Sequence, residues 1–129
     1  MRVNITAGDC LNEILSSKYP TEVFVPFREA MIEGRYEATP FSDAFLIERA
    51  KTHKSSVEDY RKHMGAFLGL LSRLDHYDEI VLWLGDEPFC LANIDVVLKT
   101  LQNRGYTKKI FLNTVVEETG EILHSEVIQ

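Results

Sequence analysis

A strongly apolar run near the middle of the chain constrains the fold more than any other feature. Residues 79–84 read Glu-Ile-Val-Leu-Trp-Leu, and Gly85, Asp86, Glu87 and Pro88 follow directly. A short continuous run bounded by a glycine turn is typical of a strand buried on both faces. Proline suits the first turn of a helix. The sequence therefore predicts a buried strand that passes into a helix, and ligands in open α/β sheets bind beyond the carboxyl ends of such strands.

The rest of the chain alternates strands and helices within one domain of residues 1–129. Further strands are expected at residues 2–6, 22–27, 109–116 and 121–128, with helices near residues 9–19, 41–53, 55–74 and 88–104. Residues 28–40 are expected to be irregular. Ser42 or a neighbour is expected to cap the helix near residues 41–53, and Ser55 or Ser56 to begin the next one. The order predicts a three-layer α/β fold, with a mostly parallel sheet flanked by helices and a C-terminal antiparallel hairpin. Gly65 and Gly69, four apart, predict close helix packing.

The charge and composition of the chain limit the kinds of molecule that it is expected to bind. The chain has 14 basic and 20 acidic residues, a net charge of -6, and no basic cluster. An acidic surface argues against nucleic acid and anionic membranes as partners. No apolar run approaches the ~20 residues of a membrane span, and two cysteines do not make a disulfide framework. We therefore expect a cytoplasmic protein, without the motifs of zinc or serine hydrolases.

Polar residues follow three of the expected parallel strands where each strand ends. Because the carboxyl ends of parallel strands share one edge of a sheet, these residues are expected to form one site. Carboxylates suit a divalent cation or general-base catalysis, and an arginine suits an anionic group such as phosphate. We therefore predict catalytic roles for Asp9, Glu29, Asp86 and Glu87, and ligand binding by Gly8, Arg28, Gly34, Cys90 and Asn93.

The same residues also have structural interpretations. Asp9 and Glu87 stand where helix caps stand, and Arg28 with Glu29 suits a surface ion pair of little energetic weight. Other structural expectations are Trp83 in the core, Cys10 and Cys90 as small buried residues, and His53 and His63 on solvated helix faces.

A family resemblance lies in the residues and the order of three segments, 3–9, 25–34 and 80–93. They look like the patterns H-I-x-N-G-D, W-R-(D/E)-x-L-x-E-G-P and L-W-F-x-x-D-x-F-C-Q-x-N of a bacterial family, domain of unknown function 1835. The resemblance spans about residues 1–105. The family's polar signature falls on Gly8, Asp9, Arg28, Glu29, Glu33, Gly34, Asp86 or Glu87, Cys90 and Asn93.

The chain departs from the family patterns at four positions. Phe27 stands in place of tryptophan, Arg35 of proline, Leu84 of phenylalanine and Leu91 of glutamine. The missing glutamine removes one hydrogen-bonding group from the site that the resemblance implies. Since the activity of the family is unknown, the resemblance implies a fold and a site but no reaction.

Three classes of function remain open from the residues alone. The first is an enzymatic or ligand-binding domain for a polar or phosphorylated metabolite at the carboxyl edge of the sheet. The second is a non-enzymatic protein-interaction module, and the third is a redox or metal role for Cys10 and Cys90. Carboxylates that converge in a concave pocket favour the first, whereas carboxylates that only cap helices favour the second.

Overall fold

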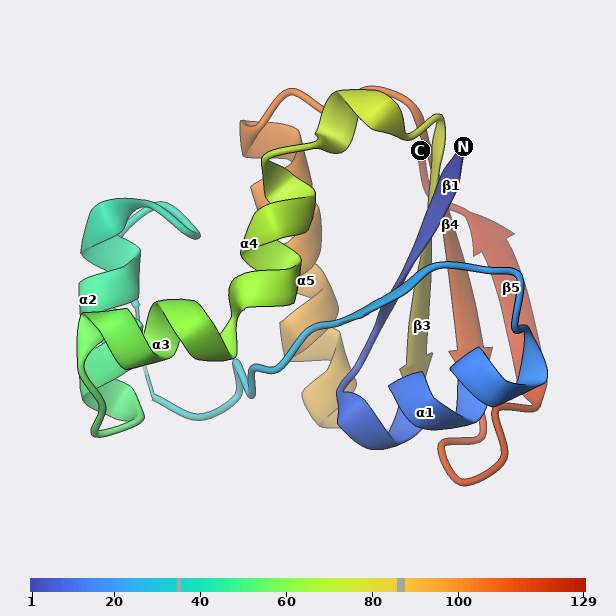
Figure 1. Cartoon of the computed structure of the whole chain (residues 1–129), viewed down its shortest axis with the longest axis horizontal. Helices are drawn as coiled ribbons and strands as arrows, with labels where there is room; N and C mark the ends of the chain where they lie inside the picture. The colour runs from blue at the N-terminus through green and yellow to red at the C-terminus, as the bar shows by residue number, and fades with distance from the viewer. Residues whose placement is uncertain (35, 86–87) are drawn as a thin grey trace.

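The computed structural model describes residues 1–34, 36–85 and 88–129, which form a sheet with helices on both faces (Figure 1). The strands are β1 (Arg2–Thr6), β2 (Phe24–Pro26), β3 (Glu79–Gly85), β4 (Lys109–Val115) and β5 (Ile122–Val127). The helices are α1 (Asp9–Lys18), α2 (Asp43–Thr52), α3 (Val57–His63), α4 (Gly65–Leu71) and α5 (Pro88–Asn103), with a 3-10 turn at Leu74–His76.

The strands lie in the order β2-β1-β3-β4-β5. The first four are parallel to one another, and β5 runs antiparallel to β4. This confirms the predicted α/β fold with a mostly parallel sheet and a C-terminal antiparallel hairpin. β2 is shorter than the expected strand at 22–27, because the Glu22 amide bonds the Tyr19 carbonyl in a turn and Pro26 has no N–H to donate.

Two cores fill the space between the sheet and its helices, so the predicted three layers are present. Successive residues of a strand point to opposite faces, and β3 therefore divides its apolar side chains between them. Val81 and Trp83 pack against Leu11 and Leu15 of α1. The larger core, on the other face, joins the alternate β3 residues Ile80, Leu82 and Leu84 to helices α2 to α5.

The helix expected over residues 55–74 is two helices. Ser56 caps α3 by accepting the Asp59 amide at 3.1 Å, but the chain turns at Met64 and restarts as α4 in another direction (Figure 1). Glycine at position 65 makes a continuous helix less favourable by about 1 kcal/mol than alanine would. The predicted close packing at the glycines is wrong: a Cβ at Gly65 would meet no atom within 4 Å, and one at Gly69 would meet the Arg73 side chain at 3.4 Å.

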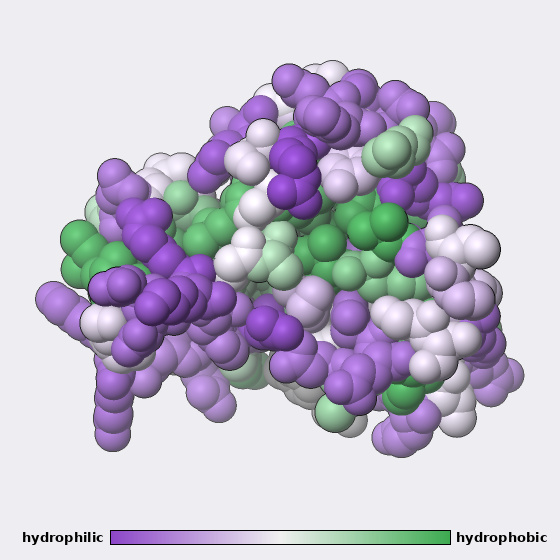
Figure 2. Space-filling model, in the orientation of Figure 1, coloured by the Kyte–Doolittle hydropathy of each residue, from purple (hydrophilic) through white to green (hydrophobic). Residues whose placement is uncertain are grey.

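The topology brings the ends of the parallel strands to one edge of the sheet. The chain leaves β1 through α1 on one face and leaves β3 through α5 on the other, so the switch point of the sheet lies between β1 and β3. The segment after β2, at residues 28–40, is irregular as predicted. Helices α2 and α3 stand beside the sheet rather than over it (Figure 1). In the space-filling view, hydrophobic residues gather in the middle of the molecule within a hydrophilic rim (Figure 2).

Candidate functional site

The carboxylate of Glu29, just after β2, is buried in a dense set of hydrogen bonds. Arg49 donates from Nε to Oε2 at 2.7 Å and from Nη2 to Oε1 at 2.8 Å. The Tyr60 hydroxyl donates to Oε2 at 2.6 Å, and Nε2 of His53 lies 2.7 Å from Oε1. The Ala30 amide donates to Oε1 at 3.0 Å. This one carboxylate therefore ties the end of β2 to both α2 and α3.

These contacts decide the charge of the cluster. Burial by itself raises the pKa of Glu29, but hydrogen bonds from Arg49, Tyr60, the Ala30 amide and His53 outweigh it and lower the pKa to about 2. The hydrogen bond to Glu29 raises the pKa of Arg49 above its already high value. Both side chains are fully buried, so the cluster holds a complete, desolvated ion pair at neutral pH. Such a pair tolerates the loss of neither partner.

Arg49 reaches the cluster because it lies on the buried face of α2. Phe45, Leu46 and Ala50 are buried on the same helix, and Arg49 shares their spacing. Ser42 caps the helix as predicted, accepting the Phe45 amide at 3.3 Å. An arginine within an apolar stripe must find a buried anion, and Glu29 is that anion.

Asn93 holds the backbone around Glu29 from the other side. Its Oδ1 accepts the Met31 amide at 2.8 Å, and its Nδ2 donates to the Glu29 carbonyl at 2.9 Å. Asn93 is buried on α5. The amide group therefore satisfies two backbone groups of a non-regular segment that would otherwise be buried without partners.

An open hollow of about 300 Å³ lies over the ends of β1 and β2. Its lining comes from the turn after β1, the segment after β2, and two histidines of the α2–α3 pair. The described lining residues are Ala7, Gly8, Asp9, Phe27, Arg28, Glu29, Ala30, His53 and His63. Within it, Arg28 Nε donates to Asp9 Oδ1 at 2.8 Å. A second hollow of about 280 Å³ adjoins His53 and His63 on the α3 side.

Both histidines of the hollow are held through Nε2. The ionised Glu29 carboxylate can only accept, so the nitrogen of His53 that faces it carries the proton. Nε2 of His63 lies 2.9 Å from the Arg28 carbonyl, which also can only accept. In their neutral forms both rings therefore keep Nδ1 as the basic nitrogen. The ring centroids lie 6.4 Å apart, and both rings line the hollow.

Four of the predicted site residues come together in this hollow: Gly8, Asp9, Arg28 and Glu29. Gly8, rather than Asp9, is the N-cap residue of α1, and no side-chain hydrogen bond caps the helix. The cap interpretation of Asp9 is therefore wrong. The surface pair of Arg28 with Glu29 is wrong too, because Arg28 pairs with Asp9 while Glu29 pairs with Arg49.

Gly34, Cys90 and Asn93 do not line this hollow. Gly34 turns with φ +74°, and the adjoining Glu33 carbonyl accepts from Arg49 at 2.8 Å, so this turn packs behind the cluster. Cys90 is buried and lines a separate apolar hollow of about 210 Å³. Asp86 and Glu87 lie outside the described residues.

No disulfide joins the two cysteines. Cys10 is exposed on α1, whereas Cys90 is buried on α5, at the opposite face of the sheet. The expectation of a small buried residue is therefore confirmed for Cys90 and wrong for Cys10.

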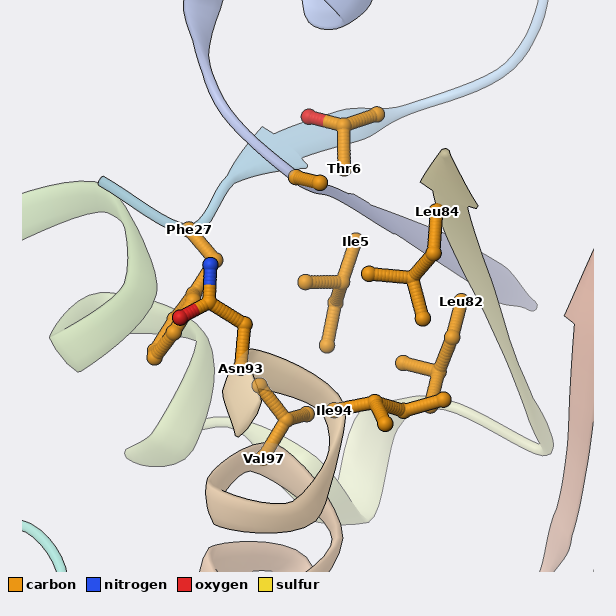
Figure 3. A pocket seen from close by; sticks show the side chains of 9 residues that line it. Ile5, Thr6, Phe27, Leu82, Leu84, Asn93, Ile94 and Val97 are labelled. Carbon is orange, nitrogen blue, oxygen red and sulfur yellow. The ribbon is translucent and has the colours of Figure 1, made fainter. Parts of the chain in front are cut away.

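The switch point itself offers little room. Figure 3 shows Ile5, Leu82 and Leu84 of the sheet facing Ile94 and Val97 of α5 across a small cavity. The volume of this cavity is about 10 Å³, which is enough for about one water molecule. Apolar side chains therefore close the crevice between β1 and β3. Among the described residues, the hollow that charged side chains line at this edge lies on the β2 side.

Four of the residues that build the site were not predicted from the sequence: Arg49, His53, Tyr60 and His63. Arg49 carried a usable signal, since a charged residue within the apolar stripe of a helix indicates a buried partner. Nothing in the sequence tells which group the hydroxyl of Tyr60 meets. His53 and His63 are exposed, as expected, but the expectation did not include the bond that His53 makes to the buried Glu29.

Within the described part of the chain, no three His, Cys, Asp or Glu side chains lie close enough together to hold a metal ion. No helix among the described residues is long and apolar enough to cross a membrane. No family model, curated protein or solved structure matches the chain. The resemblance to domain of unknown function 1835 therefore stays a prediction.

Proposed function

We propose that the chain binds a small polar metabolite in the hollow over β1 and β2, with His53 as the group that exchanges a proton with it. The contact that carries this proposal is the 2.7 Å bond between His53 Nε2 and the buried, ionised Glu29. A carboxylate in this position fixes the tautomer and orientation of an imidazole and stabilises the imidazolium that forms when the ring takes up a proton. The partly exposed ring supports a general-base role toward a bound hydroxyl or similar group.

The rest of the hollow favours a ligand with an anionic group. Arg28 offers guanidinium donors at its rim, and in the described part of the chain its Nε pairs with the exposed carboxylate of Asp9. A phosphate or carboxylate group can replace Asp9 on the fork of Arg28, since guanidinium groups bind both in a bidentate manner. His63, held by the Arg28 carbonyl, then offers Nδ1 to a donor of the same ligand. These features support a phosphorylated or carboxylated metabolite over a neutral one.

A thermal-shift panel tests the binding. The probes are inorganic phosphate, sugar phosphates, nucleotides and small carboxylates, applied to wild type, Arg28→Gln and His53→Gln. His76→Gln is the matched control, because it makes the same change on an exposed residue far along the chain. At about a hundredfold excess over Kd a ligand adds about 2.7 kcal/mol, a rise in midpoint on the order of 10 °C.

We expect an anionic probe to raise the midpoint of wild type and His76→Gln equally, with a smaller rise in the other two variants. The proposal fails if no probe shifts wild type, or if Arg28→Gln and His53→Gln respond as wild type does. The role of His53 in proton exchange is tested by nitrogen NMR. In the neutral ring, the proton should be found at Nε2. A ring protonated at Nδ1 would remove the basis for a general base held by Glu29.

A further inference from the structure

Strand β5 leaves one edge of the sheet open. All six of its residues, Ile122–Val127, are exposed, including Ile122 at 44%, Leu123 at 53% and Val127 at 55%. Natural edge strands are usually protected by lysine, proline or short length. β2, at the opposite edge, is three residues long and contains Pro26, whereas β5 has neither lysine nor proline. A six-residue exposed edge with three apolar side chains is a template for pairing with another strand.

The register of the hairpin shows which backbone groups point outward. The Ile128 amide donates to the Ile110 carbonyl at 2.9 Å, and hydrogen-bonded pairs alternate along an antiparallel ladder. Glu126 opposite Leu112 and His124 opposite Thr114 therefore also bond to β4. The N–H and C=O groups of Ser125 and Val127 point away from β4, toward the open edge. The register of the ladder shifts between Thr114 and Val115 of β4, opposite the start of β5.

We propose that two copies of this chain pair through β5, antiparallel, about a two-fold axis at Ser125. The outward N–H of Ser125 then bonds the partner's Ser125 carbonyl, and the reverse. His124 lies opposite the partner's Glu126, and Leu123 lies opposite the partner's Val127. In this register polar residues lie opposite polar residues that complement them in charge or in hydrogen bonding, and apolar residues lie opposite apolar residues. The two-fold symmetry forms each of these pairs twice.

The neighbouring registers lack this complementarity. An axis at Glu126 places the two Glu126 carboxylates directly opposite each other, which is unfavourable for like charges. An axis at His124 places Leu123 opposite Ser125, and Ile122 opposite Glu126. In the proposed register the His124–Glu126 contact within one strand, at 3.4 Å, gains a second such pair across the axis. The strand is therefore self-complementary in one register.

This pairing closes at two copies. Each chain has one long open edge, and the other edge, β2, is protected by its length and by Pro26. A dimer therefore uses both open edges and leaves no further strand to extend the sheet. The hollow lies over β1 and β2, beyond the strands that separate it from β5. Ligand binding and dimer formation are therefore independent of each other, and each can fail alone.

Sedimentation velocity of the full chain tests the dimer. Protein from about 5 to about 500 µM should show a weight-average mass that rises from 14.8 kDa toward twice that value. Ser125→Pro removes an outward N–H without touching the ladder to β4, so it should remain monomeric at all concentrations. Proton exchange at the Ser125 and Val127 amides should slow as wild-type concentration rises, whereas the Glu126 amide should stay protected throughout.

A charge exchange provides the second test. In the variant His124→Glu, the new carboxylate of each copy lies opposite the partner's Glu126. The two resulting like-charge pairs, one on each side of the axis, should weaken association at least tenfold. The double variant His124→Glu with Glu126→Lys restores opposite charges in the same register and should recover the dimer. Wild type that stays at 14.8 kDa at every concentration overturns the proposal. So does a dimer that survives in Ser125→Pro, or a folded double variant no better than His124→Glu.

Discussion

Replacing Glu29 by glutamine should destabilise the protein by an amount that depends on pH in a defined way. At pH 7 the change leaves the buried Arg49 guanidinium without its anion. Breaking one partner of a buried ion pair costs about 3–5 kcal/mol, a large share of the ~5–15 kcal/mol that a domain of this size has. We expect a loss in that range from urea unfolding at pH 7.

The pH dependence follows from the pKa of Glu29, which is lowered from 4.5 to about 2 in the folded protein. Between these values the unfolded chain binds a proton at Glu29 and the folded chain does not. The stabilisation is therefore complete above pH 4.5 and is lost as pH falls toward 2. One pKa unit corresponds to about 1.4 kcal/mol, so this contribution amounts to about 3 kcal/mol.

The assay compares urea unfolding of wild type and Glu29→Gln at a series of pH values between 7 and 2.5. Because the other acidic residues are common to both proteins, the difference in unfolding free energy isolates Glu29. Asp9→Asn is the control, since it breaks an exposed ion pair and should cost under about 1 kcal/mol at pH 7. A difference between wild type and Glu29→Gln that stays constant from pH 7 to 2.5 refutes the reasoning, as does a loss below about 1 kcal/mol at pH 7.

Three further predictions concern the residues around the cluster. Burial and the Glu29 anion raise the pKa of Tyr60 far above its ordinary value, and burial raises the pKa of Tyr106 to about 12. In an absorbance titration, these two of the five tyrosines should ionise last. The variant Tyr60→Phe should lack one of the two late steps. Asn93→Leu should lower the unfolding free energy by about 2–4 kcal/mol in urea, because two buried backbone groups lose their partner. Gly34→Ala should lower the thermal midpoint by a few degrees, about 1–2 kcal/mol, since its φ is +74° and a Cβ would lie 2.6 Å from Thr52 Cγ2.

The fold was predictable because its signals are local. The continuous apolar run of β3, the capping serines at 42 and 56, and the glycine after α5 each act within a few residues. The break at Met64 was not predictable from spacing, because apolar residues continue at helical intervals on both sides of it. In the structure Tyr60 turns toward Glu29 while Phe67 packs in the core.

The candidate site was only half predictable, for a different reason. The strand-end argument correctly brought Asp9 and Glu29 to one edge of the sheet, but it could not choose their partners. Glu29 binds residues 20, 24 and 31 positions away, and several cations in the chain had an equal claim on it by sequence. The neighbour in sequence, Arg28, binds Asp9 instead. Long-range choices of this kind depend on how α2 and α3 fold back, which no local pattern specifies.

The position of α2 and α3 explains why a substitution of Glu29 affects both stability and binding, whereas a substitution of His53 affects mainly binding. Neither helix is needed to cross from β2 to β3, because α4 already covers the sheet there (Figure 1). They are joined to the sheet edge through Glu29, whose bonds reach Arg49 of α2 and Tyr60 of α3. Removing Glu29 or Arg49 therefore disturbs the fold together with the hollow. His53 gives up one bond to a carboxylate that keeps its other donors, so loss of binding can be measured there in a protein that remains folded.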